Sequence, residues 1–162
     1  MSKILKIALE NKKPLRKCVR IIIRKNNKIV LGKRIKNDTG ELICYDFIGG
    51  GVDDASSMEE AVRKECLEEV GMAVTNIQKL SVVDSQYFVL PNPERAKIYG
   101  GGEDHYFVAD FQNNNKSIYN SEGDAMLFEW VTIDQAINKI KNGPESDYNP
   151  ARLKALNEVK HM

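Results

Sequence analysis

The sequence predicts an α/β sandwich, in which helices pack on a strand-rich sheet. Two observations lead to this fold class. Segments rich in β-branched and aromatic residues alternate with turn residues along most of the chain, and capped helical segments interrupt and end this series. Antiparallel hairpins mixed with helices are typical of layered α/β domains. The length of 162 residues suits one domain that buries about two thirds of its unfolded surface.

The strands are expected in order along the chain. Residues 17–23 and 28–34 flank Lys25-Asn26-Asn27, which indicates a hairpin turn. A third strand is expected over 43–48, running into Gly49-Gly50-Gly51. Further strands are expected at 77–90 (one long strand or two), at 105–111 before Asn113-Asn114-Asn115, and at 125–131.

Three helices are expected. The first follows the glycines, with Ser57 as its N-cap, Glu60 completing a capping box and Gly71 after its end. A second helix is expected over 132–141, capped by Thr132, and a third over 150–160. Residues 91–104 are rich in Pro and Gly, which predicts a long loop: a lid or a disordered hairpin tip.

Composition excludes several classes of protein. The formal net charge is +1 with a pI near 7.7, so no strong field favours nucleic acid. No apolar stretch approaches the length of a membrane span. Cys18, Cys44 and Cys66 are odd in number and lack Cys-x-x-Cys spacing, which favours reduced thiols in a cytoplasmic protein. Residues 1–16 form a lysine-rich polar lead, expected to be ordered only in part, and residues 17–162 a single domain.

The most informative chemistry lies in the first helix. Glu65, Glu68 and Glu69 stand at i, i+3 and i+4, so they share one helical face. Two of them occupy the last turn, where the helix dipole disfavours each acid by about 0.3–1 kcal/mol. An amphipathic surface helix accounts for the apolar stripe but not for this acidic turn. A bound cation would make each of these interactions favourable.

This segment resembles the Nudix box, whose pattern is G-x5-E-x7-R-E-U-x-E-E-x-G-U, with U aliphatic. Aligned on Gly50, the pattern covers residues 50–72, and both glycines and all three acids of its second half match. The approach Tyr45-Asp46-Phe47-Ile48-Gly49 is also similar to the family's entry into the box. Two positions depart, because Ser56 replaces the first Glu and Lys64 replaces the Arg.

The two departures are interpreted as linked. In the family the first Glu and the Arg are described as an ion pair that supports the loop. Loss of the acid removes the need for a bidentate guanidinium, so Lys64 serves as a point charge beside Ser56. The alternative is that the site is decaying, although its ligand-type acids are intact.

The resemblance implies an α/β/α sandwich around a mixed sheet and hydrolysis of a nucleoside diphosphate linked to another group. Oxygen-only ligands select Mg²⁺ or Mn²⁺, which neutralise diphosphate charge and activate water. Glu65, Glu69 and the Gly50 carbonyl would bind metal, Glu68 would bind metal or activate water, and Lys64 would orient Glu65. The family often adds an acid before the last strand, for which Glu122 is preferred over Asp124.

Substrate contacts are weaker expectations. Arg95 and Lys97 could meet phosphates from the 91–104 segment, and Tyr45 and Phe47 could stack on a base, although aromatic residues on strands are more often core. The expected partner is a small nucleotide, bound by a monomer or homodimer without nucleic acid or membrane.

Three functions stay open. The first is a metal-dependent pyrophosphohydrolase. The second is a nucleotide-binding or sensor module with little turnover, motivated by Ser56 and Lys64. The third is an isoprenoid diphosphate isomerase, which would need an acid–base pair that commonly includes a cysteine; Cys44 and Cys66 stand at core-type positions.

Overall fold

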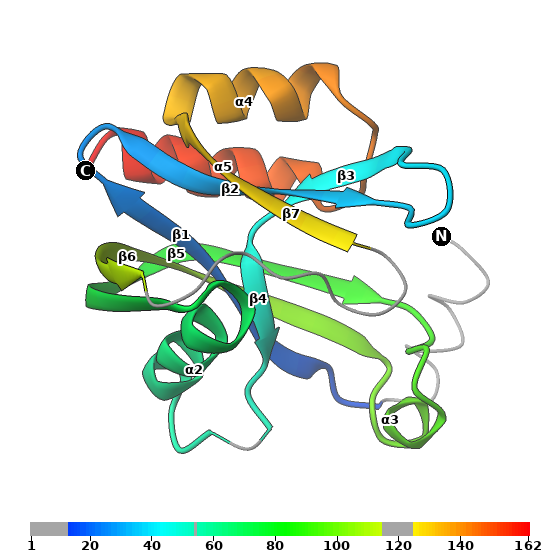
Figure 1. The fold of residues 1–162 in the computed structure, drawn as a ribbon. Helices are drawn as coiled ribbons and strands as arrows, with labels where there is room; N and C mark the ends of the chain where they lie inside the picture. The colour runs from blue at the N-terminus through cyan, green and yellow to red at the C-terminus, as the bar shows by residue number, and fades with distance from the viewer. Residues whose placement is uncertain (1–12, 54, 115–124) are drawn as a thin grey trace.

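The fold is a mixed sheet between two helical layers, which confirms the expected α/β/α sandwich (Figure 1). The computed structural model describes residues 13–53, 55–114 and 125–162. Helices α4 and α5 cover one face of the sheet, and α2 covers the other. The elements are β1 (Arg16–Lys25), β2 (Lys28–Ile35), β3 (Leu42–Asp46), β4 (Ile48–Gly51), α2 (Met58–Val70), β5 (Met72–Tyr87), α3 (Pro93–Ile98), β6 (Gly101–Asn114), β7 (Ala125–Thr132), α4 (Ile133–Asn142) and α5 (Asn149–Lys160).

Strand β1 is central to the sheet. It runs parallel to β6, and it pairs antiparallel with β2 near its end and with β4 over Cys18–Ile21. Its side chains alternate between the two faces, as expected for a strand buried on both sides. Val19 and Ile21 join the core under α2, whereas Ile22 joins the core under α5.

The single strand expected over 43–48 is wrong, because the chain forms β3 and β4 there. β3 pairs with β2, and β4 crosses to pair with β1. The break falls at Asp46, whose carboxylate accepts the Phe47 backbone N–H at 2.7 Å. The same buried carboxylate lies 3.3 Å from Arg152 and 3.6 Å from Arg34. These polar partners hold the corner at which the chain changes neighbours.

The expected hairpin and the later strands are confirmed, with different bounds. Asn26 has a φ of 56°, which the left-handed position of a two-residue turn requires. The segment expected over 77–90 is one strand, β5, which begins at Met72. Its pairing with β6 is interrupted by register shifts, one of them at Asn76, where φ is 50°.

Helix α2 begins and ends where the sequence predicts. Ser57 accepts the Glu60 backbone N–H at 3.1 Å, and Gly71 closes the helix with a φ of 63°. The capping box differs in one respect, because the Glu60 carboxylate accepts the N–H of Ser56, one residue before the cap, at 3.1 Å. The Ser56 hydroxyl donates to the same carboxylate.

The loop expected over 91–104 is wrong, because it contains helix α3 and the start of β6. Asn92 caps α3 by accepting the Arg95 backbone N–H at 3.1 Å, and Pro93 occupies the first turn. Both are ordinary helix-start signals that the density of Pro and Gly obscured. β6 therefore begins at Gly101 rather than at 105.

The two C-terminal helices confirm the sequence analysis. Thr132 caps α4 in a full capping box with Gln135, and α5 follows over Asn149–Lys160. Their apolar residues, among them Ile140 and Leu156, pack on β1, β2 and β6.

Three further observations bear on the sequence analysis. The three cysteines are unpaired, with Cys18 and Cys66 buried. No helix of the described residues is long and apolar enough to cross a membrane. Glu122, Asp124 and residues 1–12 lie outside the described residues, so the preference for Glu122 and the boundary at residue 16 stay predictions.

Replacing Asp46 with Asn should lower the free energy of unfolding by about 3 kcal/mol or more. The change removes the charge that compensates buried Arg152 and leaves that guanidinium without its counter-ion. Urea unfolding measures the effect. Glu41→Gln is the matched control, since its ion pair with Lys36 is exposed and worth at most about 1 kcal/mol.

Wild type and Asp46→Asn can also be compared as a function of pH. The neighbouring arginines and the Phe47 N–H hold the pKa of Asp46 below its ordinary value, against the opposing effect of burial. A depressed folded-state pKa contributes stability that is full above the unfolded pKa of about 3.9 and is lost as pH falls through the folded value. The stability difference between wild type and Asp46→Asn should therefore shrink in acid. A difference that is constant from neutral pH to pH ~3 would contradict this account.

Candidate active site at the α2–β4 junction

The expected metal-binding acids lie where α2 crosses the glycines of β4. The side chain of Glu65 packs directly against Gly50, at a place where a Cβ on that glycine would overlap the carboxylate. Gly49 is similarly close to the Val19 carbonyl and the Arg20 side chain. Glycine is needed here for close approach and not for an unusual backbone angle. The structure thus brings Gly50 and Glu65 together.

Glu65 and Glu69 form a half-buried carboxyl pair. The two residues stand one turn apart on α2, and both are partly buried. Burial and the neighbouring Glu65 charge raise the pKa of Glu69 to about 8. Burial and the Glu68 charge also raise the pKa of Glu65. Two acids in this arrangement require a shared proton or a cation.

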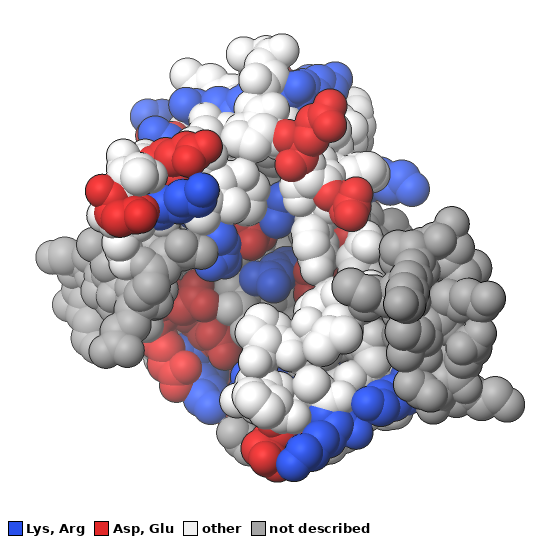
Figure 2. Space-filling model, turned by 90° about the vertical axis from the view of Figure 1, so that its right-hand side faces the viewer, with Lys and Arg blue, Asp and Glu red and all other residues white. Residues whose placement is uncertain are grey.

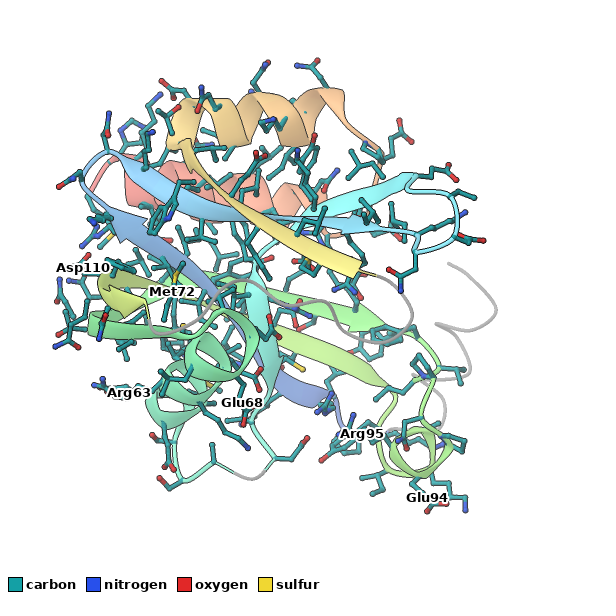
Figure 3. All side chains as sticks on the ribbon, in the orientation of Figure 1. Arg63, Glu68, Met72, Glu94, Arg95 and Asp110 are labelled. Carbon is teal, nitrogen blue, oxygen red and sulfur yellow. The ribbon has the colours of Figure 1, made fainter. Side chains whose placement is uncertain are left out.

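Glu68 stands apart from this pair. Its side chain is 54% exposed and lies 4.0 Å from Lys64. Figure 3 shows Glu68 and Arg63 on opposite sides of α2, with Glu68 toward β4. Arg63 instead pairs with Glu59 at 2.8 Å, on the side away from the site. Lys64 lowers the pKa of Glu65 through its charge, which is the direction expected of a cation placed near that carboxylate.

The two departures from the family pattern do not contact each other directly. Ser56 bonds to the Glu60 carboxylate through its N–H and its hydroxyl. These Ser56 hydrogen bonds are the main cause that lowers the pKa of Glu60. Lys64 instead lies 4.0 Å from Glu68 on the same helix.

Arg20 connects the carboxyl pair to the rest of the molecule, and the sequence analysis did not identify it. Arg20 is in register with Gly49 across the β1–β4 pair. Its Nε donates to Asp104 at 3.3 Å, and its Nη1 lies 3.9 Å from Asp46. Its positive charge lowers the pKa of both Glu65 and Glu69. The feature of the sequence that could have indicated its role is its place as a lone arginine inside the apolar run of β1.

Figure 2 shows a hollowed face, with acidic and basic side chains at the floor of the hollow. Two cavities share Arg20 as a lining residue, and together they are called the cleft. The first, of about 270 Å³, has mainly apolar walls and includes Arg16, Arg20, Phe88, Leu90, Arg95 and Tyr148. The second, of about 330 Å³, is mainly polar and includes Arg20, Arg34, Asp46, Glu145, Ser146 and Arg152. Arg20, Asp104 and Tyr148 line both cavities.

The structure separates the residues expected to bind substrate. Arg95 lines the first cavity and points from α3 toward the sheet, whereas Glu94 points away (Figure 3). Lys97 is exposed and pairs with Glu94 at 3.3 Å. Phe47 has no exposed surface and packs edge-to-face on Tyr106. Tyr45 lies beneath Lys139 of α4 and lines neither cavity.

Within the described ranges, no group of three His, Cys, Asp or Glu side chains is arranged to hold a metal ion. The geometry explains this result. Glu65 and Glu69 are partly buried, while Glu68 is exposed to solvent beside Lys64. A cation bound at these acids would have oxygen ligands only.

Known proteins share the sequence pattern of this chain over most of its length. The NUDIX domain family matches residues 14–153. An RNA pyrophosphohydrolase of Wolbachia sp. subsp. Brugia malayi is 26% identical over 139 residues, covering 80% of this chain and 82% of that protein. A NAD-capped RNA hydrolase NudC of Vibrio atlanticus is 27% identical over 117 residues, covering 72% of this chain but 38% of that protein.

Solved structures share the fold. An ADP compounds hydrolase superposes with a TM-score of 0.63 at 19% identity, over 91% of this chain and 73% of that chain. A NUDIX hydrolase from Nitrosomonas europaea superposes with a TM-score of 0.60 at 14% identity, over 91% of this chain and 89% of that chain.

The chain belongs to the NUDIX domain family, as the family match over most of its length shows. It is a Nudix-type hydrolase that acts on phosphoric anhydrides, in agreement with the pyrophosphohydrolases among its relatives.

Gly50→Ala should lower the free energy of unfolding by about 1–3 kcal/mol, because its Cβ would displace the Glu65 carboxylate or separate α2 from β4. Gly102→Ala is the control, since a Cβ there would meet its nearest neighbour, Phe88, at 3.6 Å. Urea unfolding of both variants compares the two glycines. Equal stabilities would show that α2 does not press on Gly50.

Proposed function

We propose that this protein is a Mg²⁺- or Mn²⁺-dependent pyrophosphohydrolase that cleaves the diphosphate linkage of a nucleotide derivative. One observation carries the proposal: a half-buried carboxyl pair, Glu65 and Glu69, lies at the glycines of β4, and Arg20, in register with Gly49, lines a cleft with further arginines and aromatic walls. The acids suit a hard cation, and the arginines suit phosphate oxygens.

The residues present fit a divalent cation. The pair needs positive charge to relieve its repulsion, and the Glu65 carboxylate packs against Gly50, where a Cβ would overlap it. Bound there, such a cation would neutralise charge on the diphosphate and lower the pKa of an attacking water. Glu68, exposed at the edge of the pair, is the proposed proton acceptor, and Lys64 the proposed partner that orients Glu65 by charge.

The reaction is a hydrolysis. Water attacks one phosphorus, the anhydride P–O bond breaks, and the bridging oxygen leaves with the second phosphate. The water proton passes to Glu68, and the products are two phosphate monoesters. Arg20 and Arg95 would hold the phosphates by charge-assisted hydrogen bonds while the base lies against Phe88 or Tyr148.

The two alternative functions have less support. A binding module without turnover was motivated by Ser56 and Lys64, but Ser56 is firmly bonded to Glu60 and the box loop is therefore supported. A cysteine-dependent isomerase would require an accessible thiol, yet Cys66 has no exposed surface. Cys44 lines the second cavity, but none of the acids of α2 lines that cavity with it.

The proposed substrate is a small nucleotide, taken up by a cytoplasmic monomer or homodimer without nucleic acid or membrane. The near-neutral charge supports the absence of nucleic acid. Since some relatives are named for RNA substrates, 5′-triphosphorylated and NAD-capped RNA belong beside free nucleotides in the substrate panel.

Glu69→Gln should reduce nucleotide hydrolysis by about two orders of magnitude or more, because it removes an anionic ligand from the proposed metal site. Glu59→Gln, on the same helix and facing Arg63, is the matched control. Activity at saturating Mg²⁺ is the measurement, with circular dichroism to confirm folding. Near wild-type turnover by the Glu69→Gln variant would show that Glu69 is not a ligand of the metal.

Mg²⁺ should also raise the melting temperature. Binding to the native state alone adds about 2.7 kcal/mol at a cation concentration 100 times Kd. NaCl at matched ionic strength should not reproduce the rise, and Glu69→Gln should abolish it while Glu59→Gln retains it. Identical melting curves in Mg²⁺ and NaCl would argue against a metal at this helix.

A further inference from the structure

The two cavities of the cleft share a wall that consists of Arg20, Asp104 and Tyr148. Arg20 is in register with Gly49 of β4, next to the glycine against which Glu65 packs. A diphosphate held at Arg20 therefore has room for an organic group on each side. A nucleoside triphosphate carries an organic group on one side only and would use one cavity.

The first cavity suits a nucleoside with its phosphates. Phe88, Leu90 and Tyr148 provide apolar and aromatic surface on which a base can stack. Three arginines line it against one carboxylate, Asp104, and Arg16 is in turn paired with Asp53 at 2.7 Å. The surplus of positive charge matches an anionic phosphate chain.

The second cavity has a different chemistry. Arg20, Arg34 and Arg152 line it together with three carboxylates, those of Asp46, Asp104 and Glu145. It is formally neutral, so it offers no surplus charge to a further phosphate. Its walls are more polar than those of the first cavity, so they are also poorly suited to a second nucleobase.

Hydrogen-bonding groups remain available in this second cavity. The Ser146 hydroxyl oxygen accepts from the Tyr148 N–H at 3.2 Å and from Arg152 at 3.4 Å, which leaves its own proton to donate. Glu145 is exposed and in no ion pair among the described residues. A carboxylate beside a hydroxyl donor can bind neighbouring hydroxyl groups of a ligand.

We propose that the substrate is a nucleoside diphosphate joined to a neutral, hydroxyl-rich group, that is, a nucleoside diphosphate sugar. The nucleoside occupies the first cavity, the sugar the second, and the diphosphate lies at Arg20 between them. This inference rests on the proposed function and narrows its substrate class. The products are a nucleoside monophosphate and a sugar phosphate, which mass spectrometry identifies.

The first test compares substrates that share a base: a nucleoside diphosphate sugar, the nucleoside triphosphate and the symmetric dinucleoside diphosphate, each with an adenine and a uracil series. The sugar derivative should have the highest kcat/KM by at least about tenfold in one series. Hydrolysis that favours the triphosphate or the dinucleotide in both series overturns the inference and leaves the proposed function standing. Hydrolysis of none overturns both.

The second test uses variants of each cavity. Glu145→Gln should reduce the ratio of kcat/KM for the sugar derivative to that for the triphosphate by about tenfold, because it weakens hydrogen bonds to the sugar hydroxyls. Asp147→Asn, two residues away and outside the cavity, should keep the wild-type ratio. An unchanged ratio in Glu145→Gln overturns the assignment of the second cavity.

Variants of α3 test the first cavity in the same way. Arg95→Gln should lower kcat/KM for the sugar derivative and for the triphosphate by a similar factor, so that the ratio of the two values stays unchanged. Lys97→Gln, on the same helix but outside the cavity, is its control. A loss confined to the sugar derivative in Arg95→Gln would place the sugar in the first cavity and overturn the proposed orientation.

Discussion

The close approach of α2 to the glycines of β4 is the constraint on which the rest of the site depends. It buries Glu65 and Glu69 against backbone atoms, where their charges repel and their pKa values rise. A carboxyl pair in this position needs positive charge nearby. Arg20 supplies part of it from the adjacent strand, in register with Gly49.

Arg20 in turn needs acids to hold it. Asp104 binds it from β6 and Asp46 from the corner between β3 and β4, and Asp46 also compensates Arg34 of β2 and Arg152 of α5. A continuous set of alternating charges therefore extends from Asp104 of β6 through Arg20 and Asp46 to Arg152 of α5. Such networks contribute little net stability compared with apolar packing. Here the network fixes the direction of Arg20 and forms the walls of the cleft.

The departures from the family pattern find a local explanation in this structure. Ser56 hydrogen-bonds to the Glu60 carboxylate, and Lys64 lies 4.0 Å from Glu68. The segment before α2 is thus joined to the helix by a serine instead of an ion pair, and Glu65 packs against Gly50.

The sequence by itself determined the fold class, the hairpin at Asn26, the caps Ser57, Gly71 and Thr132, and the shared face of Glu65, Glu68 and Glu69. These features depend on turn chemistry, capping and helical spacing, which act between residues a few positions apart. Helix α3 was also encoded locally, by Asn92 and Pro93, but its signals stood among loop-forming residues.

Only the tertiary structure decided the rest. The split of β3 from β4 depends on arginines from β1, β2 and α5 that meet at Asp46. The importance of Arg20, the burial of Phe47 and the separation of Arg95 from Lys97 depend likewise on neighbours distant in sequence. Helical spacing puts three acids on one face, but only packing against Gly50 buries two of them and leaves Glu68 exposed. Burial and charge compensation are properties of the assembled sheet and helices, and no local pattern of residues contains them.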